Sequence, residues 1–314
     1  MSEVVPEPGK ISLPHTSPSR MAWRRFCNNR MAVVSAYLLA CIVIAATVIP
    51  RLKHDSLDAI SDAQFERPTA AHIFGTDVHG RDVFTRVLYG TRISLIVGLV
   101  TGTISLVIGV FWGAFAGYKG GRTDSVMMRF VDIVYTLPYL LFVIILITTF
   151  EDPLKKWLSG HGLDSWTGQS RLLLLFVGLS AVSWLTMSRI VRGQILSLKN
   201  QTFVEASRAQ GASTQRIILH HLLPNTWGIV IVYLTLTIPG IMLMESFLSF
   251  LGLGVQPPQA SLGSLLADGA SAINPIKIYW WLIVFPAATM ALTLLALNFL
   301  GDGLRDALDP RTKK

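Results

Sequence analysis

The stretch ISLIVGLVTGTISLVIGVFWGAFAGY, residues 93–118, decides the fold of this chain. It contains 26 consecutive residues without a charged side chain. An α-helix rises about 1.5 Å per residue and the hydrocarbon core of a bilayer is about 30 Å thick, so roughly 20 apolar residues cross it. We therefore predict a membrane-spanning helix over this stretch.

Five similar uncharged stretches lie on either side of this one, at residues 31–49, 133–150, 172–188, 226–244 and 278–301. Lipid offers the backbone no hydrogen-bond partner, so each stretch must satisfy its own peptide groups as a helix. All five are longer than the strands of a membrane barrel, which have about ten residues. The predicted fold is all-α: a polytopic membrane protein with six transmembrane helices.

Composition excludes two other classes of protein. Hydrophobic residues make up 51% of the chain and charged residues only 15%, whereas a soluble domain has about 25% charged residues. A chain this apolar also buries enough surface to fold, which excludes disorder. The first stretch, residues 31–49, exceeds the roughly 7–15 apolar residues of a secretory signal, so we predict a retained helix.

Lys and Arg are distributed unevenly among the segments that join these stretches. With a cytoplasmic N-terminus, 17 of the 27 basic residues fall on the cytoplasmic side. Cytoplasmic loops carry such an excess, so both termini are predicted to be cytoplasmic, and the net charge of +8 indicates topology and not a nucleic-acid partner. The predicted organisation is a tail at residues 1–30, a first helix at 31–49, an extracytoplasmic loop at 50–92, a five-helix core at 93–301 and a tail at 302–314.

The sequence gives no support to metal, disulfide or nucleotide chemistry within the chain. Cys27 precedes the first apolar stretch and Cys41 lies inside it, so we predict no disulfide. The adjacent His220 and His221 would diverge by about 100° on a helix, which disfavours a metal site. No G-x-x-x-x-G-K-[ST] phosphate loop occurs, so the chain itself is predicted not to be an ATPase.

The segment 189–225 is too long for a simple connection between two spans. Its sequence predicts a short helix with Thr202 as N-cap and Glu205 three residues later, ended by Gly211. A second helical segment is predicted from residue 213 to 223, with a stop at Pro224. Two short helices joined at a glycine could dock on another protein.

These residues resemble a known motif. Glu205, Ala206 and Ser207, with Gly211 six residues after the glutamate and Leu223–Pro224 beyond, resemble the E-A-A motif of permease subunits of ABC importers. Two positions differ from that pattern, because Ser207 replaces an alanine and His221 replaces an isoleucine. The resemblance implies that this segment couples the permease to an ATPase.

Further stretches resemble the C-type branch of that family, the permease subunits of dipeptide, oligopeptide and nickel importers. They are FGTD and GRD at residues 74–77 and 80–82, RFVDIVYTLP at 129–138, ESFLSFLGLG at 245–254 followed by two prolines at 257–258, and GDGLRDALDPR at 301–311. The resemblance implies a multi-pass inner-membrane importer of di- or oligopeptides, with nickel or another small solute as the alternative. A self-contained secondary transporter would be expected to show inverted repeats or several intramembrane charges, and neither is evident.

The resemblance also implies partners. They are a homologous second permease subunit, two ATPase subunits that hold ATP and magnesium, and an extracytoplasmic substrate-binding protein. Within the chain itself the resemblance implies no cofactor.

Two acidic residues near the spans are further candidates. Glu245 follows an uncharged run in the fifth span, where it either meets a structural partner, such as an arginine or a backbone donor, or lines a pathway. Asp132 is predicted to pair with Arg129, one helical turn earlier, and this structural role is favoured over a place in the pathway.

The outer loop carries Gly75, Asp77, Gly80, Arg81 and Asp82. These residues either hold a substrate or a binding protein, or they fold the loop through Asp and Gly turns, which is the commoner use. In the second span, five glycines recur at spacings of 4, 7, 4 and 4, namely Gly98, Gly102, Gly109, Gly113 and Gly117. That stripe is predicted to pack against other helices.

Overall fold

The computed structural model describes residues 18–52, 60–257, 259–273 and 277–308. In this part of the chain the secondary structure is helical, apart from one isolated β-bridge between Thr76 and Asp82. The outermost residues of both predicted tails, and the second proline of the 257–258 pair, lie outside the described residues.

The helices are α1 Pro18–Asn28, α2 Arg30–Leu52, α3 Val83–Lys119, α4 Gly121–Tyr135, α5 Tyr139–Gly160, α6 Ser170–Leu198, α7 Thr202–Ala209, α8 Thr214–Arg216, α9 Leu223–Phe250, α10 Leu262–Ser271 and α11 Trp281–Leu308. A 3₁₀-helix, Asp164–Gln169, precedes α6, and a π-helix, Ile217–Leu222, joins α8 to α9.

Six membrane spans agree with these helices. Five helices are long and apolar enough to cross a bilayer, namely α2, α3, α6, α9 and α11. The spans of α6 and α9 include the short helices that precede them. The pair α4 and α5 gives a sixth span that is bent by 78°. Proline lacks a backbone N–H and disfavours helical geometry in the residue before it, so Pro138 divides the stretch that was predicted as one helix. The all-α prediction with six spans is confirmed.

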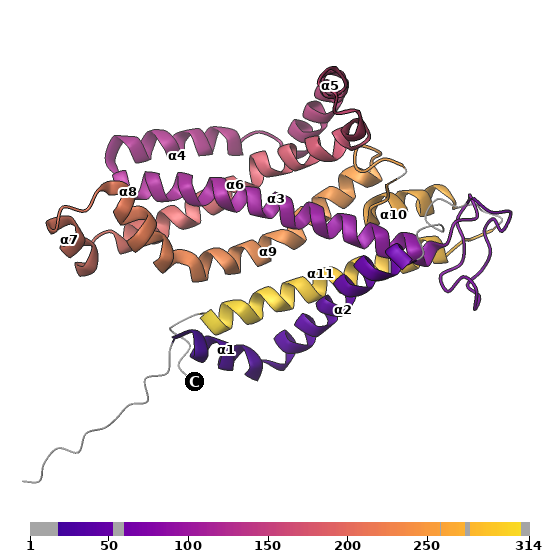
Figure 1. Cartoon of the computed structure of the whole chain (residues 1–314), viewed down its shortest axis with the longest axis horizontal. Helices are drawn as coiled ribbons and strands as arrows, with labels where there is room; N and C mark the ends of the chain where they lie inside the picture. The colour runs from indigo at the N-terminus through magenta and orange to yellow at the C-terminus, as the bar shows by residue number, and fades with distance from the viewer. Residues whose placement is uncertain (1–17, 53–59, 258, 274–276, 309–314) are drawn as a thin grey trace, which may run out of the picture.

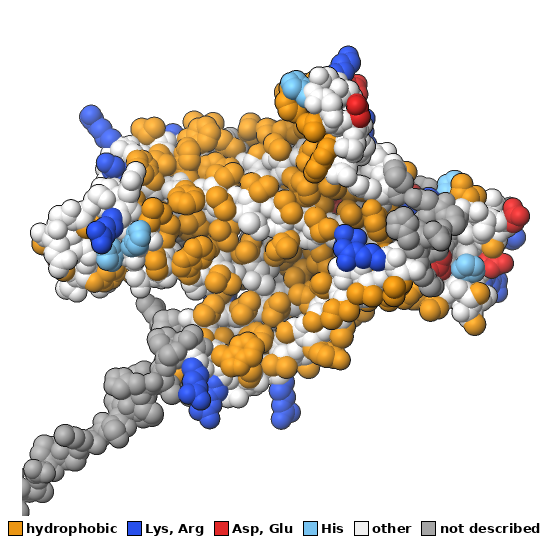
Figure 2. Space-filling model, in the orientation of Figure 1, with side chains coloured by type: hydrophobic (Ala, Val, Ile, Leu, Met, Phe, Trp, Pro, Cys, Tyr) orange, Lys and Arg blue, Asp and Glu red, His pale blue; other side chains and the backbone are white. Residues whose placement is uncertain are grey.

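The long helices α3, α6 and α9 run side by side along the molecule (Figure 1). Helices α2 and α11 pack together along one side of this group. The short helix α10 and the loop before α3 lie at one end, and α7 lies at the opposite end. Apolar side chains cover most of the length between the two ends in Figure 2, as expected for a surface that faces lipid or other membrane helices.

The glycine stripe of α3 packs within the chain. A Cβ at Gly109 would lie 2.8 Å from the Trp184 carbonyl oxygen of α6, and one at Gly117 would lie 3.0 Å from the Arg192 carbonyl oxygen. Gly98 faces α9 instead, where a Cβ would lie 3.0 Å from the Ile238 side chain. Glycine therefore lets α3 approach two neighbours closely, as predicted for helix packing.

Several helices extend beyond the uncharged stretches. Helix α3 begins at Val83, ten residues before its stretch, and α11 continues to Leu308 inside the segment predicted as a tail. Helix α1 lies within the predicted N-terminal tail. Charged and polar residues occupy these extensions, so hydropathy alone could not delimit them.

Candidate functional site

The first helix of the 189–225 segment, α7, begins differently from the prediction. The carbonyl of Gln201 accepts the N–H groups of Val204, at 2.9 Å, and Glu205, at 3.2 Å. Gln201 is therefore the N-cap, without a side-chain cap, and the prediction of Thr202 as N-cap is wrong. The helix starts one residue earlier because these backbone bonds already satisfy its first turn.

Gly211 ends α7 as predicted. Its φ is +78°, in the left-handed region that favours glycine. Its N–H donates to the Arg208 carbonyl at 3.0 Å, and the Ala212 N–H donates to the Ser207 carbonyl at 3.1 Å. This pair of bonds is a Schellman motif, which reverses the chain sharply at a fixed angle.

The chain after Gly211 continues into the membrane without the predicted stop. Ser213 caps α8, and helical structure then runs through the π-helix into α9. Pro224 stands in the first turn of α9, where its missing N–H costs little. The Asn225 side chain donates to the His221 carbonyl at 2.6 Å, which satisfies a backbone acceptor beside the proline. The prediction that the second helix ends at Pro224 is therefore wrong.

Residues 202–223, which we call the protrusion, have an apolar underside and an exposed tip. Val204, Ile217 and Leu222 are fully buried, and they pack in one core with buried residues of α3 and α6. Glu205 and Ala206 are exposed. Within the described residues, the Glu205 carboxylate has no hydrogen bond or ion pair. The protrusion is thus packed against α3 and α6 on its buried side and exposed at its tip.

Polar contacts fix the base of the protrusion to the rest of the bundle. Arg192 of α6 donates to both carboxylate oxygens of Asp124 in α4, at 2.5 and 2.6 Å. Lys199 donates to the Gly117 carbonyl at 3.1 Å, at the end of α3. The Arg208 guanidinium lies 5.6 Å from the centre of the Tyr118 ring. The end of α6 that leads into the protrusion is therefore tied to α3 and α4, and Arg208 ties the protrusion itself to the end of α3.

Asp132 has a different partner from the one predicted. It accepts a hydrogen bond from Arg189 of α6 at 2.8 Å, so the predicted pairing with Arg129 is wrong. The Arg189 guanidinium also lies 4.5 Å from the Tyr135 ring centre. Packing of α6 against α4 brings this cation close, and a contact between helices cannot be read from spacing along one helix.

Glu245 lies in α9 and is completely buried. Ser249 donates to one carboxylate oxygen at 2.6 Å, and Ser94 of α3 donates to the other at 2.9 Å. Ser246 adds a longer contact of 3.4 Å. The carboxylate therefore lies among hydroxyl groups, whereas the sequence suggested an arginine or a backbone donor as its structural partner.

Two of these serines, Ser94 and Ser249, also form hydrogen bonds with the start of α10. The Leu262 N–H donates to the Ser94 hydroxyl at 3.3 Å, and the Ser261 hydroxyl donates to the Ser249 hydroxyl at 3.1 Å. Ser261 is also the N-cap of α10. We call these residues the Glu245 network, namely Glu245, Ser94, Ser246, Ser249 and Ser261. The network joins α3, α9 and α10.

In the outer loop, Asp77 organises the turn. It accepts the backbone N–H groups of His79 and Arg81, at 2.8 and 2.9 Å, and side-chain donors from Arg81 and Arg86, at 2.8 and 2.5 Å. Burial raises the pKa of the Asp77 carboxyl, but the Arg81 backbone bond and the two guanidinium charges outweigh it, so the pKa lies below its ordinary value.

The other residues of the outer-loop motif also fold the loop. Gly75 and Gly80 have φ of +75° and +72°. Asp82 caps α3 by accepting the N–H of Thr85 at 3.1 Å and its hydroxyl at 2.6 Å. Each charged side chain of the motif makes at least one hydrogen bond within the turn or to the start of α3, which supports the self-structuring alternative.

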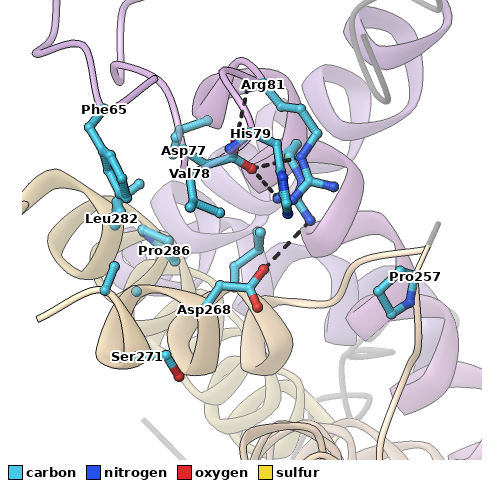
Figure 3. Close-up of a pocket in the computed structure, with 15 residues that line it drawn as sticks. Phe65, Asp77, Val78, His79, Arg81, Pro257, Asp268, Ser271, Leu282 and Pro286 are labelled. Atoms are coloured by element: carbon cyan, nitrogen blue, oxygen red, sulfur yellow. Dashed lines mark hydrogen bonds and ion pairs between the residues drawn. The ribbon is translucent and has the colours of Figure 1, made fainter. Parts of the chain in front are cut away.

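A cavity of about 430 Å³ lies beside this turn, between the loop, α10 and α11 (Figure 3). Asp268 of α10 faces it, with one carboxylate oxygen 3.7 Å from Arg86. Apolar walls come from Phe65, Leu282 and Pro286. Among the described residues, no cluster of three or more His, Cys, Asp or Glu side chains could hold a metal ion.

Sequence reasoning missed α10, the π-helix and the roles of Arg86 and Asp268. A capping box between Ser261 and Ser264 marks the start of α10, and the spacing of these serines was a usable indication. The π-helix has no comparable pattern, because its wider turn is fixed by packing.

The bundle of spans with its protrusion defines a class, the membrane-embedded permease. Residues 109–314 match the model of the binding-protein-dependent transport system inner membrane component family, and the chain belongs to that family. Residues 17–68 match the N-terminal TM domain of oligopeptide transport permease C. The resemblance drawn from the sequence motifs is thereby confirmed.

Relatives and a solved structure agree with this family. The chain is 45% identical over 309 residues to the dipeptide transport system permease protein DppC of Bacillus subtilis, covering 98% of this chain and 90% of the relative. It is 44% identical over 295 residues to the oligopeptide transport system permease protein OppC of Escherichia coli, covering 93% and 91%. An inward-facing structure of the MetNI methionine ABC transporter matches with a TM-score of 0.54 and 19% identity, covering 72% of this chain and 97% of that chain, which indicates a shared fold.

Proposed function

We propose that this chain is one permease subunit of an ATP-driven importer of di- or oligopeptides. It forms the translocation pathway with a homologous second permease subunit, and separate ATPase subunits supply the energy. The observation that carries the proposal is the near-full-length similarity to peptide permeases from two distant bacteria, at 45% and 44% identity. An extracytoplasmic binding protein delivers the peptide, in keeping with the family's name.

The proposed contact with an ATPase is the tip of the protrusion. Glu205 and Ala206 are exposed there, while Val204 beneath them is fully buried. A rigid element with a free tip suits transmission of a movement from an ATPase, and the ion pair of Asp124 with Arg192 supports its base. Gly211 fixes the angle between the two arms. Leu223 and Pro224 lead the second arm into α9.

The proposed orientation places both termini and the protrusion in the cytoplasm and residues 50–92 outside. The excess of basic residues, 17 of 27, supports it. Helices α1 and α7 lie toward the same end of the bundle in Figure 1, which is consistent with a shared side of the membrane.

We assign structural roles to the acidic candidates. Glu245 joins three helices through serine hydroxyls, Asp132 joins α4 to α6, and Asp77 and Asp82 fold the outer loop. The geometry of these residues supports that assignment over a direct contact with the solute, because each carboxylate already accepts at least one hydrogen bond from another group of the protein.

The substrate class is tested by ATP hydrolysis. The complete assembly, purified with its binding protein, is incubated with dipeptides, longer peptides or Ni²⁺. We expect peptides to stimulate hydrolysis and Ni²⁺ to leave it at the basal rate. Stimulation by Ni²⁺ alone would replace the peptide assignment with the metal one.

A further inference from the structure

Helix α1 has features that the transport function does not use. Residues 18–52, which contain α1 and α2, include Arg20, Arg24, Arg25 and Arg30 in the first turns and contain no acidic residue. Residues 24 and 26 are separated by about 200° on a helix, so Arg24 and Phe26 lie on opposite faces. The helix is therefore amphipathic, with a basic face and an aromatic face.

The position of α1 is fixed relative to the spans. A single residue, Asn29, joins it to α2, and the Asn29 side chain accepts the Ala32 N–H at 3.2 Å. Phe26 packs toward α11, where a Cβ at Gly303 would lie 3.7 Å from its ring. Helix α11 packs against α2 as well as α1. Helix α1 is therefore held at the N-terminal end of the first span.

The outward side of α1 combines apolar and basic groups. Trp23 is 67% exposed, although its ring stacks on Phe26 with 6.0 Å between the centroids. Arg24 and Arg30 are exposed and have no ion pair within the described residues. Basic side chains gather at this end of the molecule in Figure 2. Arg20 and Arg25 have interactions of their own. Arg24 and Arg30 are therefore the basic side chains in and next to α1 that can bind a ligand.

We infer that α1 is an interfacial helix that binds the phosphate groups of anionic phospholipids through Arg24 and Arg30. Tryptophan is favoured at the boundary between headgroups and acyl chains, and Trp23 lies between the aromatic and basic faces. Amphipathic helices with arginine on one face and aromatic residues on the other lie in this boundary. A cation cluster next to a transmembrane helix, in a segment that itself contains no acidic residue, complements an anionic lipid surface.

An anionic lipid fits these observations better than an acidic protein does. A protein partner would need only the arginines, whereas the exposed Trp23 and Met21 beside them require an apolar environment. The inference concerns the lipid surface and is independent of the transported solute.

The test measures lipid binding to the complete assembly. The assembly is stripped of lipid in detergent and incubated with increasing phosphatidylglycerol, or with phosphatidylcholine in parallel, and bound lipids are counted by native mass spectrometry. In the Arg24→Gln, Arg30→Gln double variant, we expect the strongest phosphatidylglycerol site to weaken roughly 30-fold, from the contribution of two cations at an anionic surface. Phosphatidylcholine binding should not change.

Two control variants separate this site from general charge. Arg122→Gln with Arg129→Gln removes the same charge from exposed arginines outside α1 and outside the protrusion, and it should bind phosphatidylglycerol like the wild type. Arg24→Lys with Arg30→Lys keeps the charge and should retain most of the affinity. An equal loss in the Arg122 and Arg129 variant would overturn the inference, as would unchanged lipid binding in the first variant. Loss of the ATPase subunits with normal lipid binding would also overturn it, in favour of a protein contact.

Discussion

Two buried carboxylates in this chain are stabilised in different ways. Asp77 lies against two guanidinium groups and two backbone N–H groups in the outer loop. Glu245 lies among serine hydroxyl groups between three helices, with no cation among the groups that bond it. Removing the acid therefore leaves the buried Arg86 with only the longer contact to Asp268 in one place, and it leaves hydroxyl groups without an acceptor in the other.

Substitution of Glu245 tests the role of its network. Glu245→Gln keeps the size of the side chain but replaces one acceptor oxygen with an amide NH₂, so one serine loses its acceptor. We expect the assembly to be destabilised by about 1–3 kcal/mol, the cost of an unsatisfied buried polar group, as measured by a lower melting temperature. Glu66→Gln, at an exposed position outside the proposed ATPase contact, makes the same chemical change and should not alter the melting temperature. A normal melting temperature with abolished transport in Glu245→Gln would assign Glu245 to the pathway.

The Asp77 carboxyl predicts a dependence of stability on pH. Since its pKa is lowered in the folded loop, its contribution is complete above the ordinary pKa of about 3.9 and is lost as the pH falls through the lower folded value. At neutral pH, Asp77→Asn should cost about 3–5 kcal/mol, because Arg86 is buried beside it. Protease resistance of the outer loop from pH 7 to pH 3 would measure both effects. Glu66→Gln, an exposed change of charge in the same loop, should leave resistance unchanged; an equal loss in that variant would contradict the account.

Among the helices, the proposed coupling to an ATPase depends on the angle between α7 and the helix that follows it. The Schellman bonds at Gly211 set that angle, and the apolar underside of the protrusion anchors it to α3 and α6. The proposed function of the protrusion as a lever requires the angle to stay fixed while the tip is pushed.

Substitution of Gly211 tests the lever. A Cβ meets no other atom within 4 Å at Gly211 or at Gly193 of α6, but only Gly211 has a left-handed φ. Gly211→Val should therefore abolish transport while the protein still reaches the membrane, and Gly211→Ala should be strained by about 1–2 kcal/mol. Gly193→Ala, in a normal helical conformation, should transport normally. Wild-type uptake by Gly211→Val at normal abundance would show that the protrusion does not couple the subunits.

The spans could be predicted from the sequence because lipid exposure depends on consecutive residues, and so could the turn at Gly211, whose φ is a local property. Contacts between elements could not. The partner of Asp132 is 57 positions away at Arg189, and Glu245 meets Ser94 from 151 positions away. The start of α7 and the passage through Pro224 were missed because backbone bonds and a π-turn replaced the side-chain cap and the helix stop that the sequence favoured.

At the scale of the whole molecule, function requires the two ends of the bundle to face opposite sides of the membrane. The outer loop, the cavity and α10 lie at one end, and the protrusion lies at the other. The charge asymmetry supports the proposed orientation, in which the protrusion lies in the cytoplasm.

Cysteine accessibility tests this orientation. In a background with Cys27 and Cys41 replaced by serine, a membrane-impermeant thiol reagent in intact cells should label Ser61→Cys and should not label Ser197→Cys. Both positions are exposed on the protein, so only the side of the membrane should distinguish them. Permeabilised cells provide the control, in which both should react. Labelling of Ser197→Cys alone in intact cells would invert the topology.

In the proposed function, this chain imports peptides only as part of an ATP-driven assembly. The direct measurement is uptake of a radiolabelled dipeptide into proteoliposomes that contain this chain with its second permease and ATPase subunits, with binding protein outside and ATP inside. The account predicts uptake that requires ATP, the binding protein and every subunit. Uptake by this chain alone, driven by a proton or sodium gradient and indifferent to ATP, would contradict it.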